Sequence, residues 1–102
     1  MTVKLVVLYT QPEDRSAFDE HYLGVHGPLV AKLPGLQRFE SGTVAMALDG
    51  GEHTYHRIAE LYFADSAAMQ AAFGSPEGQE TAADYQAIAP PGSRMFVEQL
   101  DD

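Results

Sequence analysis

A chain of 102 residues, with 45% hydrophobic and 21% charged residues, has the length and composition of one globular domain. The formal net charge of −9, with six lysines and arginines and no basic cluster, argues against nucleic acid and anionic membranes as partners. The absence of cysteine excludes disulfides, a thiolate nucleophile and Cys-ligated metal or iron–sulfur sites. Neither a signal-type segment nor an apolar run of about 18 residues is present, so we expect a cytoplasmic protein.

The first predicted strand is Val3–Tyr9, a short run rich in β-branched and aromatic residues. An amphipathic helix is expected from about Asp14 to Gly24, because apolar residues follow at helical spacing. These apolar positions are Phe18, Tyr22, Val25 and Leu29. Pro28 lacks an N–H and disfavours helical backbone at the residue before it. We therefore expect a kink near Gly27 and then a short helical turn to Lys32.

The rest of the chain is predicted to contain three strands and one interrupted helix. In chain order these are a strand at Leu36–Leu48 bent near Gly42, a strand at Tyr55–Phe63, a helix at Ala67–Phe73 that resumes at Glu77–Ile88, and a strand at Arg94–Leu100. The Asp49-Gly50-Gly51 turn joins the first two of these strands in a hairpin. Asp65 and Ser66 are expected to cap the helix, which Gly74-Ser75-Pro76 interrupts.

The order strand, helix, strand, strand, helix, strand is the ferredoxin-like pattern, which predicts one α+β domain over residues 1–102. In this fold the helices cover one face of a four-stranded antiparallel sheet. Alternation places apolar side chains on both faces of two strands. In the first strand one face carries Val3, Leu5, Val7 and Tyr9, and the other carries Val6 and Leu8. In the strand at Tyr55–Phe63 one face carries Ala59, Leu61 and Phe63, and the other carries Ile58 and Tyr62. Because the helix-free face is also apolar, we expect a homodimer in which these faces pack together.

Four short motifs and two further segments form a recognisable pattern. The motifs are Tyr9-x-x-Pro12-x-Asp14, Phe18-x-x-His21-Tyr22, His26-x-Pro28-Leu29 and Lys32-Leu33-Pro34-Gly35-Leu36, and the segments are Ala59–Phe63 and Ser75–Gly78. Together they resemble the EthD family, named for its association with ether degradation, over nearly the whole chain. The resemblance implies a ferredoxin-like fold assembled as a dimeric α/β barrel. The wider superfamily includes cofactor-free monooxygenases, muconolactone-type isomerases, haem enzymes and proteins without known activity, so the resemblance implies function only broadly.

His26 is the first candidate catalytic residue, because irregular backbone at the expected kink would aim its imidazole into a cleft between helix and sheet. An imidazole titrates near neutral pH and suits general acid–base chemistry on a small organic molecule. In the structural alternative, His26 hydrogen-bonds the carbonyl groups freed by Pro28. His21 is not expected to act with His26, because five residues along a regular helix place two side chains roughly 140° apart.

Glu60 is the second candidate catalytic residue, since a carboxylate inside an otherwise apolar strand is buried at a cost unless it is paired or protonated. The alternative is a structural ion pair with an arginine. The available cations are Arg38, Arg57 and Arg94. The candidate substrate-binding residues are Tyr9, Tyr22 and Tyr62. Their hydroxyl groups would either line a pocket or be satisfied within the core.

The leading hypothesis is a small catabolic enzyme that binds a hydrophobic metabolite and removes a proton next to its carbonyl group, with His26 as the base. The product would be an isomer or, as in an oxidoreductase, the result of cofactor-free oxygenation. No cofactor and no metal site are expected, because nucleotide-binding motifs and metal-type histidine spacing are absent. The rival is a non-catalytic dimeric module that binds a small molecule or assists an oxidation pathway. A cavity lined by His26 and a tyrosine would favour the enzyme.

Overall fold

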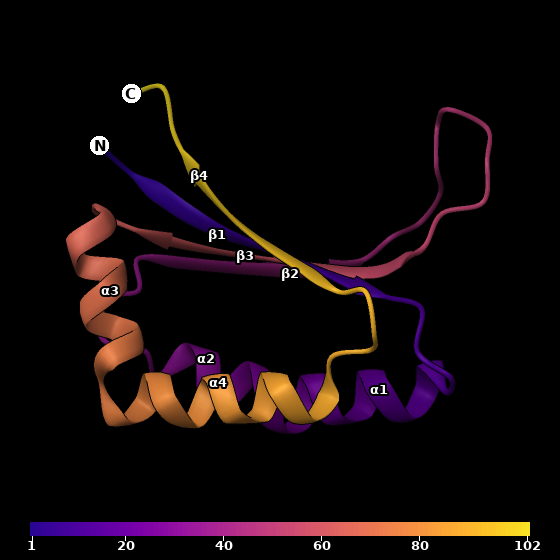
Figure 1. Ribbon diagram of the computed structural model, residues 1–102, viewed down its shortest axis with the longest axis horizontal. Coiled ribbons are helices and arrows are strands. Elements are labelled where there is room, and N and C mark those ends of the chain that lie inside the picture. Colours follow the sequence, from indigo (N-terminus) through magenta and orange to yellow (C-terminus); the bar gives the residue numbers. More distant parts are fainter.

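Four antiparallel strands form one layer and the helices form the other in the computed structural model, which describes residues 1–102 (Figure 1). In chain order the elements are β1 (Val3–Thr10), α1 (Arg15–His21), the π-helix η1 (Tyr22–His26), α2 (Gly27–Ala31), β2 (Arg38–Thr43), β3 (Tyr55–Phe63), α3 (Ser66–Gly74), α4 (Pro76–Ile88) and β4 (Arg94–Gln99). The strand order is β2-β3-β1-β4, and each neighbouring pair is antiparallel. The predicted α+β ferredoxin-like fold is confirmed.

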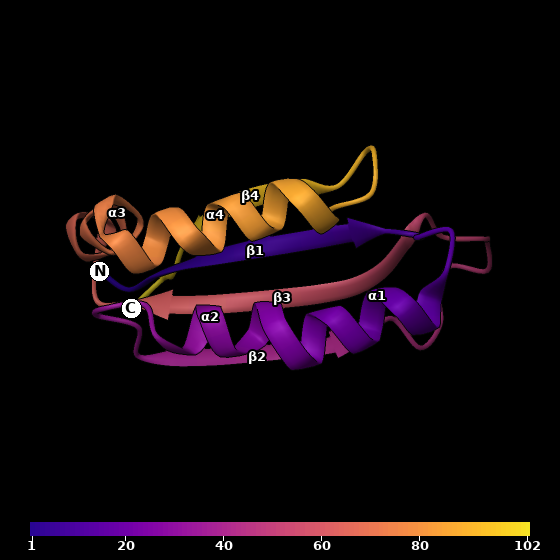
Figure 2. The same cartoon turned by 90° about the horizontal axis from the view of Figure 1, so that it is seen from below.

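The covered face of the sheet holds the hydrophobic core. The run α1–η1–α2 lies over β2 and β3, and α4 lies over β1 and β4 (Figure 2). Val3, Val7 and Tyr9 of β1 point into this layer and are buried, as the alternation predicted. Leu61 pairs with Leu5 and Ala59 pairs with Val7 across the β1–β3 ladder, so β3 contributes its small and branched residues to the same core.

The opposite face carries no helix. The side chains of Lys4, Val6 and Leu8 alternate with the core residues of β1 and therefore point to this face. Their direct partners on β3 are Tyr62, Glu60 and Ile58, and on β4 they are Glu98, Phe96 and Arg94. Charged residues thus gather at the Lys4 end of the helix-free face, and the other end is apolar except for Arg94, whose guanidinium lies over the Phe96 ring.

The first helical run differs from the expected kink. The backbone stays helical through His26 (φ −67°, ψ −47°) and Gly27 (φ −56°, ψ −47°). The Gly27 N–H bonds to the carbonyl of Tyr22, five residues back, so the turn before Pro28 is wider than an α-helical turn. A Cβ on Gly27 would lie 3.3 Å from that carbonyl oxygen, which favours glycine here. The expected helical turn after Pro28 is present as α2, and a π turn, rather than a break in the helix, accommodates the proline.

The second strand is shorter than predicted. β2 ends at Thr43, and β3 begins at Tyr55. The residues between the two strands form a long connection that extends past the sheet (Figure 1). Met46 and Leu48 in this connection are 68% and 94% exposed, so their apolar character does not signal a buried strand. The predicted turn is present, and Gly50 adopts the left-handed conformation with φ +84°.

The interrupted second helix is confirmed. The Asp65 side chain accepts a hydrogen bond from the Ala68 N–H and caps α3. Ser75 ends α3 and caps α4 through the Gly78 N–H, with Pro76 at the first position of the new helix. None of the helices has the length and apolar character that crossing a membrane requires.

Candidate active site

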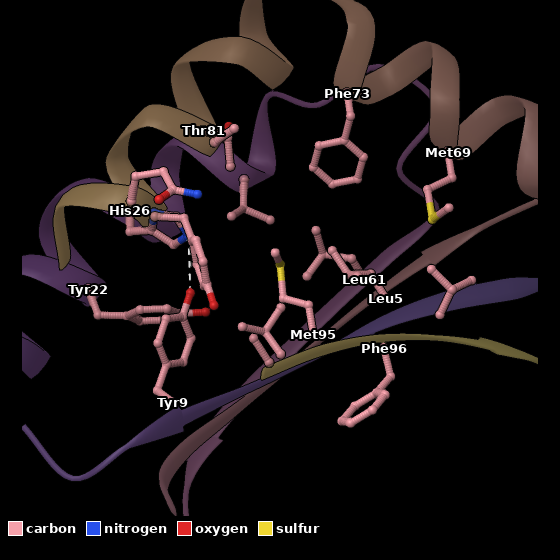
Figure 3. A pocket seen from close by; sticks show the side chains of 17 residues that line it. Leu5, Tyr9, Tyr22, His26, Leu61, Met69, Phe73, Thr81, Met95 and Phe96 are labelled. Carbon is pink, nitrogen blue, oxygen red and sulfur yellow. Dashed lines mark hydrogen bonds between the residues drawn. The ribbon is translucent and has the colours of Figure 1, made fainter. Parts of the chain in front are cut away.

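A cavity of about 300 Å³ lies between the helices and the covered face of the sheet. Most of its lining is hydrophobic, and the polar side chains gather at one end. Figure 3 shows Tyr9, Tyr22 and His26 together at that end, with Phe73 and Met69 at the other. The shape suits a small ligand that is apolar along most of its length and polar at one tip.

His26 lines the polar end of the cavity and is almost completely buried. Its Nδ1 lies 2.8 Å from Oδ2 of Asp84. Its Nε2 lies 3.4 Å from the Tyr9 hydroxyl, as the dashed line in Figure 3 marks. A carboxylate only accepts hydrogen bonds, so Nδ1 carries the proton and Nε2 presents a lone pair toward Tyr9 and the cavity. The ring has no hydrogen bond to a backbone carbonyl, so the alternative in which His26 bonds the carbonyl groups freed by Pro28 is wrong: both nitrogens point to side chains.

Two opposing effects set the proton affinity of His26. Burial lowers its pKa, while the hydrogen bond and the negative charge of Asp84 act in the opposite direction without cancelling the shift. Partial burial alone would raise the pKa of Asp84, but hydrogen bonds from His21 and His26 outweigh it and hold that pKa below its ordinary value. At neutral pH the pair is therefore a neutral imidazole beside a carboxylate.

His21 belongs to the same cluster, contrary to the expectation from regular helical spacing. Its Nε2 lies 2.9 and 3.1 Å from the two carboxylate oxygens of Asp84. The π-helix explains the difference, because hydrogen bonds that span five residues bring side chains five positions apart toward one side. The residues are not arranged as a metal site: no group of three or more histidine, cysteine, aspartate or glutamate side chains could hold a metal ion.

Asp84 is the residue that sequence reasoning missed. It lies on α4, 58 positions after His26, and reaches the histidines because α4 packs beside η1 and α2. The available signal was its place next to Tyr85, which the helical spacing of α4 directs inward. That spacing cannot indicate which residues of another helix lie opposite.

Two buried phenols complete the polar end of the cavity. The Tyr22 hydroxyl is buried without a hydrogen-bond partner, and the Tyr9 hydroxyl has His26 at 3.4 Å. Burial raises the pKa of both tyrosines, so each keeps a proton that it can donate to a ligand. The Arg57 guanidinium lies 4.4 Å from the centre of the Tyr22 ring and is held by Asp19, whose Oδ1 is 3.1 Å from Nη2.

Glu60 and Tyr62 lie on the helix-free face, away from this cluster. The Lys4 Nζ is 2.9 Å from Oε2 of Glu60, and the Tyr62 hydroxyl donates to Glu60 and Glu40 at 3.3 and 3.2 Å. The expected arginine partner is wrong, because the register of β1 against β3 places Lys4 next to Glu60 instead. The structure therefore brings together His26, Tyr9 and Tyr22, and it separates them from Glu60 and Tyr62.

Comparison with known protein families matches residues 10–90 to the EthD domain. The chain belongs to the EthD family. The matched range contains His21, His26 and Asp84, so the hydrogen-bonded cluster lies within the EthD domain, and Tyr9 lies one residue before it.

Similar proteins agree with this assignment. The crystal structure of an EthD-family protein from Bacillus halodurans is 34% identical over 98% of this chain and 99% of that chain, with a TM-score of 0.91. An uncharacterized 11.0 kDa protein in the thcB–thcC intergenic region of Rhodococcus erythropolis is 41% identical over 93 residues, which is 91% of this chain and 89% of that protein. SnoaB, a cofactor-independent oxygenase from Streptomyces nogalater, shares the fold alone, with 17% identity over 99% of this chain and 94% of that chain and a TM-score of 0.70.

Proposed function

We propose that this EthD protein is a small-molecule enzyme that removes a proton from the carbon next to the carbonyl group of a hydrophobic metabolite. The observation that carries the proposal is the orientation of His26. Because Asp84 holds Nδ1–H at 2.8 Å, the basic Nε2 points to the cavity. Burial keeps the imidazole neutral and ready to accept a proton, and Asp84 stabilises the imidazolium that forms.

The tyrosines supply the second part of the chemistry. Removing a proton beside a carbonyl moves negative charge onto the carbonyl oxygen, and that charge needs a hydrogen-bond donor. The unpartnered hydroxyl of Tyr22 is the first donor, and Tyr9 becomes the second when substrate displaces it from His26. Of the three candidate tyrosines, the proposal uses these two and leaves out Tyr62.

The cavity restricts the substrate class. Its volume of about 300 Å³ lies at the lower end of ligand pockets, and the hydrophobic side chains beyond the polar end include Leu61, Met69 and Phe73. No cationic side chain lines it, since Arg57 lies behind the Tyr22 ring. A neutral ketone, lactone or quinone-like compound of one or two rings meets these conditions better than a carboxylate.

The carbanion has two productive fates in this site. In an isomerisation, His26 returns the proton to a different carbon of the substrate. In an oxygenation, dioxygen adds to the carbanion, which is the chemistry suggested by the fold shared with the cofactor-independent oxygenase from S. nogalater. Both fates begin with the same proton transfer to His26, and both fit a role in catabolism.

A non-catalytic binding module is the second candidate. It is favoured by one observation: both ring nitrogens of His26 have partners within the chain, Asp84 and Tyr9, before any ligand arrives. A module of this kind would use the cavity and the phenols to hold a ligand without moving a proton.

Deuterium exchange distinguishes the two candidates without knowledge of the natural substrate. The probe is 2-tetralone, a hydrophobic bicyclic ketone, incubated with the protein in D2O and followed by proton NMR. If the protein is an enzyme, the signals of the protons on the carbons beside the carbonyl should disappear much faster than they do in buffer alone. Saturable binding without accelerated exchange would support the module and overturn the catalytic proposal.

The proposal includes a homodimer formed by the helix-free faces. Val6, Leu8, Ile58 and Phe96 form the apolar end of that face, and Phe96 is 45% exposed. A second copy would cover this surface. Sedimentation at micromolar concentration should show a dimer, and a species that remains monomeric would overturn this part of the proposal.

A further inference from the structure

The π-helix places two histidines of different exposure on one carboxylate. The side chain of His21 is 38% exposed, that of Asp84 is 15% exposed and that of His26 is 5% exposed. The exposure of the three side chains thus decreases from His21 through Asp84 to His26, which lines the cavity. His26, the buried member of the cluster, is the group that the proposed reaction must protonate and deprotonate in every cycle.

We infer that His21 and His26 share one proton through Asp84, so that uptake of a substrate proton by His26 releases a proton from His21 to solvent. This inference rests on the proposed function, because it assigns the route by which the catalytic base is reset. His21 acts through Asp84 and His26, and is therefore a positioning residue rather than a catalytic one.

Charge balance in the cluster motivates the inference. One carboxylate neutralises one imidazolium, and a second imidazolium would leave an uncompensated positive charge beside a buried ring. An imidazolium costs less at His21 than at His26, since the half-exposed ring of His21 retains hydration that the buried ring of His26 lacks. His26 stays neutral and basic.

The transfer balances without a proton passing through the carboxylate. The C–H bond of the substrate breaks, its proton forms a bond to Nε2 of His26, and the electron pair stays on the substrate. The Nδ1–H of His26 remains bonded to Asp84, which now faces two imidazolium rings. Repulsion between the two rings favours loss of a proton from His21. The proton leaves from Nδ1 of His21 to water, and Nε2–H of His21 keeps its hydrogen bond to Asp84.

Other groups around His26 do not compete for this role. Tyr9 from β1, Tyr22 from η1 and Tyr85 from α4 face the cavity as neutral phenols, because burial raises the pKa of each. The cation of Arg57 on β3 is paired with Asp19 of α1. Besides Asp84, the neighbour whose charge acts on the pKa of His26 is therefore His21.

Histidine titration by NMR tests the inference on the intact protein. Imidazole carbon and nitrogen shifts are followed with pH in the wild-type chain, in His21→Gln and in His53→Gln, a control in the distant β2–β3 connection. His21→Gln should raise the pKa of His26 by about one unit, because it removes a positive charge and leaves Asp84 to one imidazole. The control should leave the pKa of His26 unchanged.

The wild-type titration gives a second criterion that does not depend on the folding of a variant. Shared protonation predicts that the curves of His21 and His26 are broadened and shift together with a Hill coefficient below one. Independent curves with unit Hill coefficients, or an unchanged pKa of His26 in folded His21→Gln, would overturn the inference.

The same samples separate this inference from the proposed function. In the 2-tetralone exchange, the pH profile should move upward in His21→Gln together with the pKa of His26. Coupled titration of His21 and His26 without deuterium exchange would support the shared proton and contradict the proposed catalytic function. Deuterium exchange with the same pH profile in the wild-type chain and in His21→Gln would contradict the shared proton and support the proposed catalytic function.

Discussion

The two faces of the sheet hold their ionisable side chains in opposite ways. On the covered face, burial lowers the pKa of His26 against the pull of Asp84, so the ring stays neutral but close to a charge that would stabilise its protonated form. On the helix-free face, the hydrogen bond to Glu60 raises the pKa of Lys4, and the two side chains form a lasting ion pair. Only the first arrangement can change protonation near neutral pH.

This difference shows what distinguishes a reactive group from a structural one in this fold. A carboxylate that forms an ion pair with a lysine is stabilised in its charged form. A neutral histidine beside a carboxylate that stabilises its protonated form can accept a proton and return it, which acid–base catalysis requires. Glu60 and His26 were both reasonable candidates, and their surroundings separate them.

Truncating an aromatic residue on each face gives the largest expected contrast. Phe63 is fully buried, so Phe63→Ala should cost about 3–5 kcal/mol of unfolding free energy. Phe96 is 45% exposed, and Phe96→Ala should cost much less in dilute protein while weakening the dimer at higher concentration. Denaturant unfolding at two protein concentrations measures both effects, and equal losses at the two sites would contradict the assignment of core and interface.

Removing the charge of Asp84 should have the next largest effect. Asp84→Asn replaces the ionised acceptor of both His21 and His26, and charge-assisted hydrogen bonds of this kind contribute about 1–3 kcal/mol. The expected result is a loss of unfolding free energy in that range at neutral pH. A neutral effect would mean that the cluster is not formed in solution.

The ion pair on the helix-free face should contribute less. The side chains of Lys4 and Glu60 are 18% and 30% exposed, and pairs near the surface contribute about 0–1 kcal/mol. Lys4→Met should therefore reduce stability by no more than this amount, and the loss should shrink at high salt. A salt-independent loss as large as that of Asp84→Asn would show that the two faces are energetically alike.

The pH dependence of stability should be the smallest effect and should differ between the faces. The pKa of His26 is lowered from 6.5, so the unfolded chain binds more protons and stability falls as the pH drops below that value. The pKa of Lys4 is raised from 10.5, so its contribution is present below that value and is lost as the pH rises above it. Unfolding curves should lose the acid slope in His26→Gln, whereas Lys4→Met should only reduce the alkaline slope, because the pKa of buried Tyr9 and Tyr22 is also raised from 10.0. An unchanged acid slope in His26→Gln, or an unchanged alkaline slope in Lys4→Met, would contradict these assignments.

Sequence reasoning succeeded where the chain carries local signals. The alternation in Val3–Tyr9 and the turn at Gly50 determine strands and a hairpin, and Ser75-Pro76 marks a helix break whatever the rest of the fold does. The same alternation correctly put Glu60 and Tyr62 together on one face. It could not say which face the helices cover, because both faces carry apolar residues.

The parts of the site that could not be predicted depend on contacts between distant elements. Asp84 meets His26 only after α4 has packed beside η1. The alignment of His21 with His26 requires a π turn, which the sequence does not distinguish from a kink at Pro28. In both cases the local pattern permits several outcomes, and tertiary packing selects one.

The most direct test of the central claim compares His26→Gln with Glu60→Gln in the exchange of 2-tetralone protons for deuterium. Both changes replace a titratable side chain by an amide, one in the cavity and one on the opposite face of the sheet. We expect His26→Gln to lower the protein-catalysed rate on the order of 100-fold or more, because a general base is lost, and Glu60→Gln to retain the wild-type rate. Undiminished exchange in folded His26→Gln, or an equal loss in both variants, would contradict the central claim.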